Sequence, residues 1–138
     1  MNAAAIIAAA RSQLGVPFRH QTRLAGQYLD CAGLVMVVAD RLGVAYEAPQ
    51  NYARTPHNRL IEGVLDNQPG LMRVSLNERQ AGDILSMRIG REPQHLGIFS
   101  GTTLIHCYEA VGRVVEHDLS ADWAARIDRV YRFREVTP

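Results

Sequence analysis

Three residues of the kinds used in thiol hydrolysis stand out in this sequence, although they are far apart along it. Cys31 lies in the segment Asp30–Val35, and His95 and His106 follow much later in the chain. Nucleophilic catalysis by cysteine needs a base within hydrogen-bond reach and a third group that orients the base. We therefore expect Cys31 to be the nucleophile, His95 the general base and His106 the residue that orients His95.

The residues after Cys31 predict the helix that would position it. Apolar residues recur there at helical spacing, at Leu34, Val35, Val38 and Leu42. Gly43 is a stop signal, so the pattern predicts a helix over 31–42 with Asp30 as its N-cap. The free N–H groups and the dipole of a helix N-terminus stabilise negative charge, so we expect the pKa of Cys31 to lie below the ordinary value of about 8.5.

A hairpin is predicted to carry both histidines. Residues 95–99 and 102–108 have the composition of short strands, and Ser100-Gly101 between them is a turn dipeptide. A two-residue loop there places His95 directly opposite His106, with the two rings on one face and their Cβ atoms about 5 Å apart.

Two further residues of this hairpin follow from the alternation of faces. Gly97 falls on the histidine face, where it would let a helix lie close across the strand. Cys107 falls on the opposite face from the histidines, which predicts a small core hydrophobe turned away from Cys31.

The remaining elements predict an α+β fold in one domain covering 1–138. Two further helices are expected, at 2–14 and 55–67. Three further strands are expected, at 83–89, 113–117 and 127–134, with a short helical turn near 121–123. Helices first and antiparallel strands later is the α+β pattern.

Composition excludes several classes of protein. The chain has 138 residues, 47% of them hydrophobic, and a formal net charge of +1, which favours neither nucleic acid nor an anionic membrane as a partner. Two cysteines are too few for a disulfide scaffold. The apolar residues 3–10 lack a preceding basic segment, so we expect an ordinary first helix, no secretion signal and no membrane insertion. No cofactor is expected.

Simpler interpretations of the same residues stay open. Cys31 could be a buried core thiol, and His95 and His106 could be a structural pair or part of a zinc site, although their spacing fits no common zinc pattern. Asp30 could be a helix cap alone. The remaining histidines, and the tryptophan expected in the core, are not assigned to the site: His20, His57, His117 and Trp123.

The motifs 30–35, 95–99 and 105–106 together resemble the nucleophile, base and third-residue motifs of the NlpC/P60 family of papain-like cell-wall peptidases. The similarity is strongest to the phage branch of that family, through four further segments: 15–21, 82–83, 114–116 and 123–133. The resemblance implies a papain-like fold in which the nucleophile helix packs on a five- to six-stranded antiparallel sheet. It also implies hydrolysis of a peptidoglycan stem peptide, typically between D-γ-glutamate and diaminopimelate or lysine.

The phage branch implies a biological setting as well. The protein would be a tail component, made in the host cytoplasm without a signal peptide, that meets tail-tip or baseplate proteins and acts at the cell wall. An alternative is a structural tail-tip protein with an inactive or weakly active fold. An acyltransferase or amidase of the wider papain-like group would use the same three residues.

The resemblance also points to substrate-binding residues and to two departures. Asp30 and Phe18 are the expected substrate contacts. Phe18 stands where the family usually has tyrosine, and Ala32 stands where many relatives have serine. Both departures remove a hydroxyl near Cys31, which leaves the backbone N–H of Cys31 as the expected oxyanion donor.

Overall fold

The computed structural model describes residues 2–19, 22–47, 60–89 and 92–134. Its helices are α1 (Ala3–Arg11), α2 (Cys31–Leu42), α3 (Leu60–Asp66) and the short α4 (Ala121–Ala124), with one 3-10 turn at Leu76–Glu78. No helix within these described ranges is long and apolar enough to span a bilayer.

Helix α2 begins and ends where its capping residues predict. The carboxylate of Asp30 accepts a hydrogen bond of 2.6 Å from the backbone N–H of Gly33, and Gly43 ends the helix with a φ of 72°. That left-handed conformation is the usual helix terminus for glycine. Eight consecutive residues after Cys31, 32–39, are buried, so the helix is held by packing on nearly all sides.

An antiparallel sheet of six strands forms the other layer, in the order β3-β8-β4-β5-β6-β7. Its strands are β3 (Leu71–Val74), β4 (Ile84–Ile89), β5 (Glu92–Phe99), β6 (Thr103–Tyr108), β7 (Arg113–Asp118) and β8 (Ile127–Phe133). A separate pair, β1 (Arg23–Leu24) and β2 (Tyr28–Leu29), precedes α2. The predicted α+β fold and strand number are confirmed.

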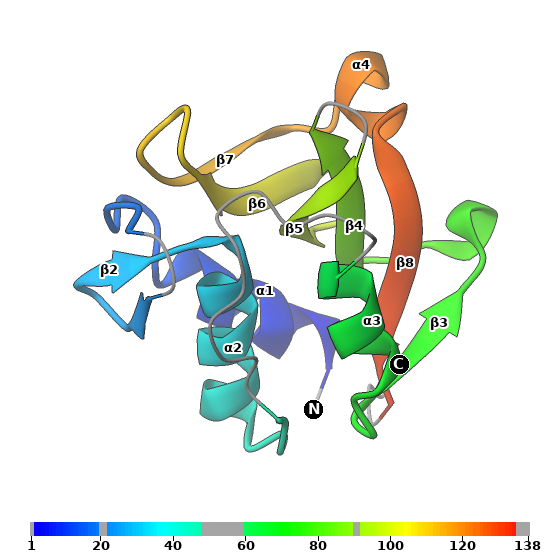
Figure 1. The fold of residues 1–138 in the computed structure, drawn as a ribbon, viewed down its shortest axis with the longest axis horizontal. Coiled ribbons are helices and arrows are strands. Elements are labelled where there is room, and N and C mark those ends of the chain that lie inside the picture. Colours follow the sequence, from blue (N-terminus) through cyan, green and yellow to red (C-terminus); the bar gives the residue numbers. More distant parts are fainter. Residues whose placement is uncertain (1, 20–21, 48–59, 90–91, 135–138) are drawn as a thin grey trace.

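The two faces of the sheet have separate apolar clusters. The larger cluster joins α1 and α2 to one face, which includes Leu96, Ile98 and Cys107. The smaller one lies on the other face around Leu104, and Trp123 of α4 packs against it. Figure 1 shows α1 and α2 together on one side of the strands, with α4 where β7 leads into β8.

Several element boundaries differ from the sequence prediction. The first helix ends at Arg11 and continues as turns, because Gly15 takes a positive φ of 86° and its N–H donates to Val114 of β7. Residues 55–59 of the predicted helix at 55–67 lie outside the described residues. The strands β1, β2 and β3 were not predicted, since each is only two to four residues long.

The hairpin register also differs from the prediction. Gly97, not His95, lies opposite His106, and Phe99 pairs with Leu104. The loop is centred one residue later than expected, since the N–H of Ser100 donates to the carbonyl of Thr103 and Gly101, with a φ of 107°, takes the first loop position. A one-residue shift of the loop moves the register by two residues, so the faces are preserved.

Candidate active site

Cys31 is the first residue of α2, and its sulfur lies at the edge of β5. The backbone N–H groups of Leu96, Ala32 and Cys31 itself lie near the sulfur, where they favour its charged form. Pairing between β5 and β6 ends at Gly97, so Leu96 lies just beyond it, while on its other side Leu96 pairs with Ser86 of β4. The thiol thus lies beside the residue that follows His95 in the chain.

Burial sets the pKa of this thiol and overturns the expected sign. Loss of hydration raises the pKa of Cys31 to about 12, and the neighbouring carboxylate of Asp30 raises it further, while the three backbone N–H groups oppose the rise. The N-terminal position was expected to lower this pKa. That expectation is wrong for the free protein because a thiolate at this partly buried position loses more hydration than the three N–H groups restore.

The two predicted histidines meet on one face of the sheet. Nε2 of His95 lies 2.6 Å from Nδ1 of His106, and their ring centroids are 4.9 Å apart. They are diagonal neighbours, because His106 opposes Gly97. One residue of β5 is left unpaired between Pro93 and His95, and this bulge comes immediately before the histidine. Bulges of this kind re-aim side chains next to functional sites.

Burial keeps both imidazoles neutral. His95 is 2% exposed and His106 is completely buried. Desolvation lowers the pKa of His95 to about 3, with a smaller contribution from the positive charge of Arg126. Desolvation also lowers the pKa of His106 to about 2, assisted by the two neighbouring histidines. The resting site therefore combines a neutral thiol with neutral imidazoles.

Gly97 makes room for a strand neighbour and not for a helix. A Cβ on Gly97 would overlap the side chain of Leu104 and would lie 3.3 Å from Cβ of His106. Helix α2 covers the opposite face, where Leu96 and Ile98 point. The expectation that a helix crosses the histidine face is therefore wrong.

Cys107 is the small core residue that the alternation of faces predicts, but it is not turned away from Cys31. It is fully buried in the cluster that α2 covers, and its Sγ lies 3.3 Å from the carbonyl oxygen of Leu29. Burial raises its pKa to about 12, and a charge on Cys31 adds to that rise. Neither cysteine is in a disulfide.

The predicted substrate contacts lie on the chain entering α2. The Asp30 side chain is 2% exposed and caps the helix. Phe18 packs partly buried against the larger apolar cluster, and it forms an isolated parallel bridge with Leu29, two residues before Cys31. His20 and His57 lie outside the described residues.

Three aromatic residues around the histidines were missed or misplaced by the sequence argument. Nε2 of His117 lies 2.7 Å from Nε2 of His106, so it is no isolated surface residue. The ring of Tyr108 stacks on His106 at 4.6 Å, and Trp123 contacts His106 edge-on at 5.0 Å. Strand alternation could have found Tyr108, which lies two residues after His106.

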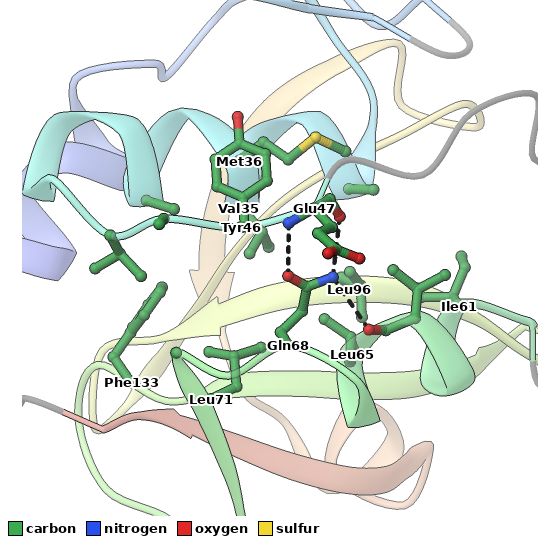
Figure 2. Close-up of a pocket in the computed structure, with 16 residues that line it drawn as sticks. Val35, Met36, Tyr46, Glu47, Ile61, Leu65, Gln68, Leu71, Leu96 and Phe133 are labelled. Atoms are coloured by element: carbon green, nitrogen blue, oxygen red, sulfur yellow. Dashed lines mark hydrogen bonds between the residues drawn. The ribbon is translucent and has the colours of Figure 1, made fainter.

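A small apolar cavity lies between α2, α3 and β5. It has a volume of about 70 Å³, and its wall includes Ala32 and Leu96, the chain neighbours of Cys31 and His95. Figure 2 shows Gln68 at one side of this cavity. Its side-chain amide accepts a hydrogen bond from the backbone N–H of Glu47 and donates one to the carbonyl oxygen of Glu47, each with a length of 2.9 Å. Ligand pockets usually have 300–1,000 Å³, so this cavity is too small for an organic cofactor.

Metal ligation finds no support in the part of the chain that the structure describes. No group of three or more His, Cys, Asp or Glu side chains there is arranged to hold an ion. The described groups are of the kinds used in proton transfer: a thiol at a helix N-terminus, the buried imidazole of His95, whose chain neighbour Leu96 lies beside that thiol, and a second imidazole, His106, bonded to the first.

Solved structures with a similar fold come from several bacteria. An NlpC/P60 family protein from Bacillus cereus is 17% identical with a TM-score of 0.72, covering 96% of this chain and 40% of its own. The NlpC/p60 domain of the peptidoglycan hydrolase SagA is 23% identical with a TM-score of 0.62, and the match covers 94% of this chain and 97% of the SagA domain. The peptidoglycan hydrolase RipB from Mycobacterium tuberculosis is 19% identical with a TM-score of 0.62, and the match covers 99% of this chain and 65% of RipB.

Sequence comparison gives the family. This chain spans less than half of some relatives, 42% of a lipoprotein-like NLP/P60 protein from Staphylococcus aureus for example. No curated protein matches the sequence. The sequence profile of the NlpC/P60 family matches residues 15–132, which include Cys31 and both histidines of the site. The chain therefore belongs to the NlpC/P60 family.

Proposed function

We propose that this protein is a cysteine peptidase that hydrolyses an amide bond in the stem peptide of peptidoglycan. One observation carries the proposal: the backbone N–H of Leu96, the chain neighbour of His95, lies beside the Cys31 sulfur, and Nε2 of His95 lies 2.6 Å from Nδ1 of His106. This arrangement supports Cys31 as the nucleophile, His95 as the base and His106 as the residue that orients the base.

The reaction begins from neutral groups. Because burial raises the pKa of Cys31 and lowers that of His95, the proton moves from sulfur to imidazole as the sulfur attacks the amide carbon. The C–N bond then breaks, and the imidazolium returns the proton to the leaving amine. Water attacks the resulting thioester, His95 takes a proton from that water, and the acid product leaves as the thiol re-forms.

The negative charge on the carbonyl oxygen needs donors that are already in place. The backbone N–H of Cys31 is at the start of α2, where the helix dipole adds to its effect. Removing one such donor from a hydrolase typically costs about 10²–10³ in rate, so a single fixed N–H contributes substantially. Phe18 and Ala32 provide no hydroxyl for this purpose.

The substrate class rests on the relatives. SagA and RipB are peptidoglycan hydrolases. We infer that the bond cut here lies between D-γ-glutamate and diaminopimelate or lysine, and that Asp30 and Phe18 face the substrate.

Synthetic stem peptides with either residue, incubated with the protein and analysed by mass spectrometry, test this. Cleavage after D-γ-glutamate is expected. No cleavage of either peptide, or of intact peptidoglycan, would favour a structural protein that has kept the fold without the activity.

The biological setting is a second part of the proposal. We infer that the protein is a tail component of a phage or phage-like particle, made in the host cytoplasm, which meets tail-tip or baseplate proteins and opens the wall locally. The support is the similarity of segments 15–21, 82–83, 114–116 and 123–133 to the phage branch of the family. Mass spectrometry of purified particles tests it: the protein should be found among the tail proteins, and its absence there would count against this setting.

A further inference from the structure

We propose that His117 fixes the tautomer of the catalytic base through a relay of three imidazoles that ends on a peptide carbonyl. The proposal rests on the function proposed above, in which His95 accepts the proton of Cys31. In this role His117 is a positioning residue, because it acts through His106.

The relay is continuous from β5 to β7. Nε2 of His95 lies 2.6 Å from Nδ1 of His106, and Nε2 of His106 lies 2.7 Å from Nε2 of His117. Nδ1 of His117 lies 2.9 Å from the carbonyl oxygen of Asp118. The three rings come from three neighbouring strands and share one face of the sheet.

At only one end of this relay does the chemistry of the partner decide which atom donates and which accepts. A carbonyl oxygen can accept but never donate, so Nδ1 of His117 must carry the hydrogen of its bond to Asp118. A neutral imidazole has one N–H and one lone pair. The proposed relay therefore takes the neutral form of His117, in which Nε2 accepts and the partner nitrogen of His106 donates to it.

The direction then passes to the base. With Nε2–H donating to His117, Nδ1 of His106 is an acceptor, and Nε2 of His95 must donate to it. Nδ1 of His95 is left with the lone pair. A general base needs this free lone pair to take a proton from Cys31, so the carbonyl of Asp118 selects the competent tautomer of His95 through two intervening rings.

Packing holds the terminal ring of the relay in place. The indole of Trp123 contacts the rings of both His117 and His106, with centroids 5.2 Å and 5.0 Å away. The guanidinium of Arg126 lies over the outer side of that indole, 4.4 Å from its centroid. Helix α4 and the residues after it thus cover a ring pair that would otherwise face water, and they restrict rotation of His117.

Three replacements of His117 separate this role from a structural one. In His117→Gln, the amide oxygen reaches roughly the position of Nε2 and can still accept from His106. His117→Leu fills similar space with no acceptor. His117→Lys offers only donors, so Nε2 of His106 would have to accept from it, which reverses donor and acceptor in every bond of the relay. Arg113→Gln is the matched control, because it places the same residue at an exposed position of the same strand.

We expect kcat to depend on whether the side chain at position 117 can accept a hydrogen bond from His106. His117→Gln should keep kcat within about threefold of the wild type, whereas His117→Leu should lose on the order of 10- to 100-fold, by analogy with the partners that orient metal-bound histidines. His117→Lys should lose more than His117→Leu, since a wrong tautomer of a catalytic histidine costs up to roughly 10⁴. Equal activity of the Gln and Lys variants would overturn the proposal.

A measurement on the wild type alone keeps the test independent of turnover. In ¹⁵N NMR spectra of histidine-labelled protein, His95 and His106 should each carry hydrogen on Nε2, and His117 should carry it on Nδ1. Hydrogen on Nδ1 of His95 would overturn the relay. If the wild type cleaves no stem peptide but shows these tautomers, the proposed function fails while the relay stands.

Discussion

Replacing Gly33 by alanine should destabilise the protein, although alanine is the better helix former. Gly33 lies in the first turn of α2, where a Cβ would overlap the carbonyl oxygen of Thr22 and would lie 3.0 Å from a carboxylate oxygen of Asp30. That carbonyl also accepts the N–H of Asp30 at 3.2 Å, and the carboxylate caps the helix through the N–H of Gly33. The added methyl group therefore forces apart two contacts that hold the first turn of α2, where Cys31 lies.

The magnitude follows from what must move. Alanine gains about 1 kcal/mol of helix propensity over glycine. Against this, overpacking against backbone costs about 1–3 kcal/mol, and weakening the cap costs about 1 kcal/mol more. We expect a net loss of roughly 1–3 kcal/mol in the free energy of unfolding, which for a domain of this size lowers Tm by about 3–12 °C.

Gly63→Ala is the matched control for this experiment. Gly63 is an exposed glycine of α3, and a Cβ there would meet nothing within 4 Å. Its replacement should raise the stability by about 0.5–1 kcal/mol. Thermal unfolding followed by circular dichroism compares the two variants. A rise in Tm for Gly33→Ala, similar to that for Gly63→Ala, would refute the steric argument.

Three further predictions concern the site. Gly97→Ala should lower the free energy of unfolding by about 1–3 kcal/mol, and it should lower peptide cleavage by more than this loss explains. The reason is that a Cβ there lies 3.3 Å from Cβ of His106 and overlaps a buried leucine. Cleavage assays below the unfolding temperature check this, and unchanged activity would contradict it. The free energy of unfolding, measured by urea titration between pH 7 and 4, should decrease as the pH drops under about 6.5. Burial lowers the pKa of His95 to about 3 and that of His106 to about 2, so as the pH drops the unfolded chain binds protons at these rings before the folded protein does. The loss is up to about 1.4 kcal/mol per ring and pH unit. A flat profile would show that the rings are not held neutral. Iodoacetamide should label Cys31 and Cys107 in the folded protein more slowly at pH 7.5 than a free thiol, and faster as the pH rises, since burial raises both pKa values to about 12. Rapid, pH-independent labelling of Cys31 would point instead to a preformed thiolate.

Local signals predicted the bounds of helix α2 correctly because they act within a few residues. Asp30 and Gly43 have their effect on neighbouring backbone groups, so the bounds 31–42 follow from the sequence and agree with the structure. The same holds for the alternation that put His95 and His106 on one face. These features need no knowledge of the remaining chain.

Features that depend on tertiary contacts could not be predicted in this way. The hairpin register depended on which loop position Gly101 takes, and the sequence allows either. The sign of the pKa shift of Cys31 depended on how closely apolar residues surround the sulfur. His117 was set aside because its partner, His106, lies on another strand. Each error comes from a contact between segments distant in sequence.

The identity of the nucleophile is tested most directly by comparing two cysteine variants on one stem peptide. Cys31→Ala removes the proposed nucleophile, and Cys107→Ala removes the buried thiol on the same side of the sheet. Product formation measured by mass spectrometry, on variants whose folding is checked by circular dichroism, should persist in Cys107→Ala and disappear in Cys31→Ala. Cleavage by Cys31→Ala at the wild-type rate would contradict the account.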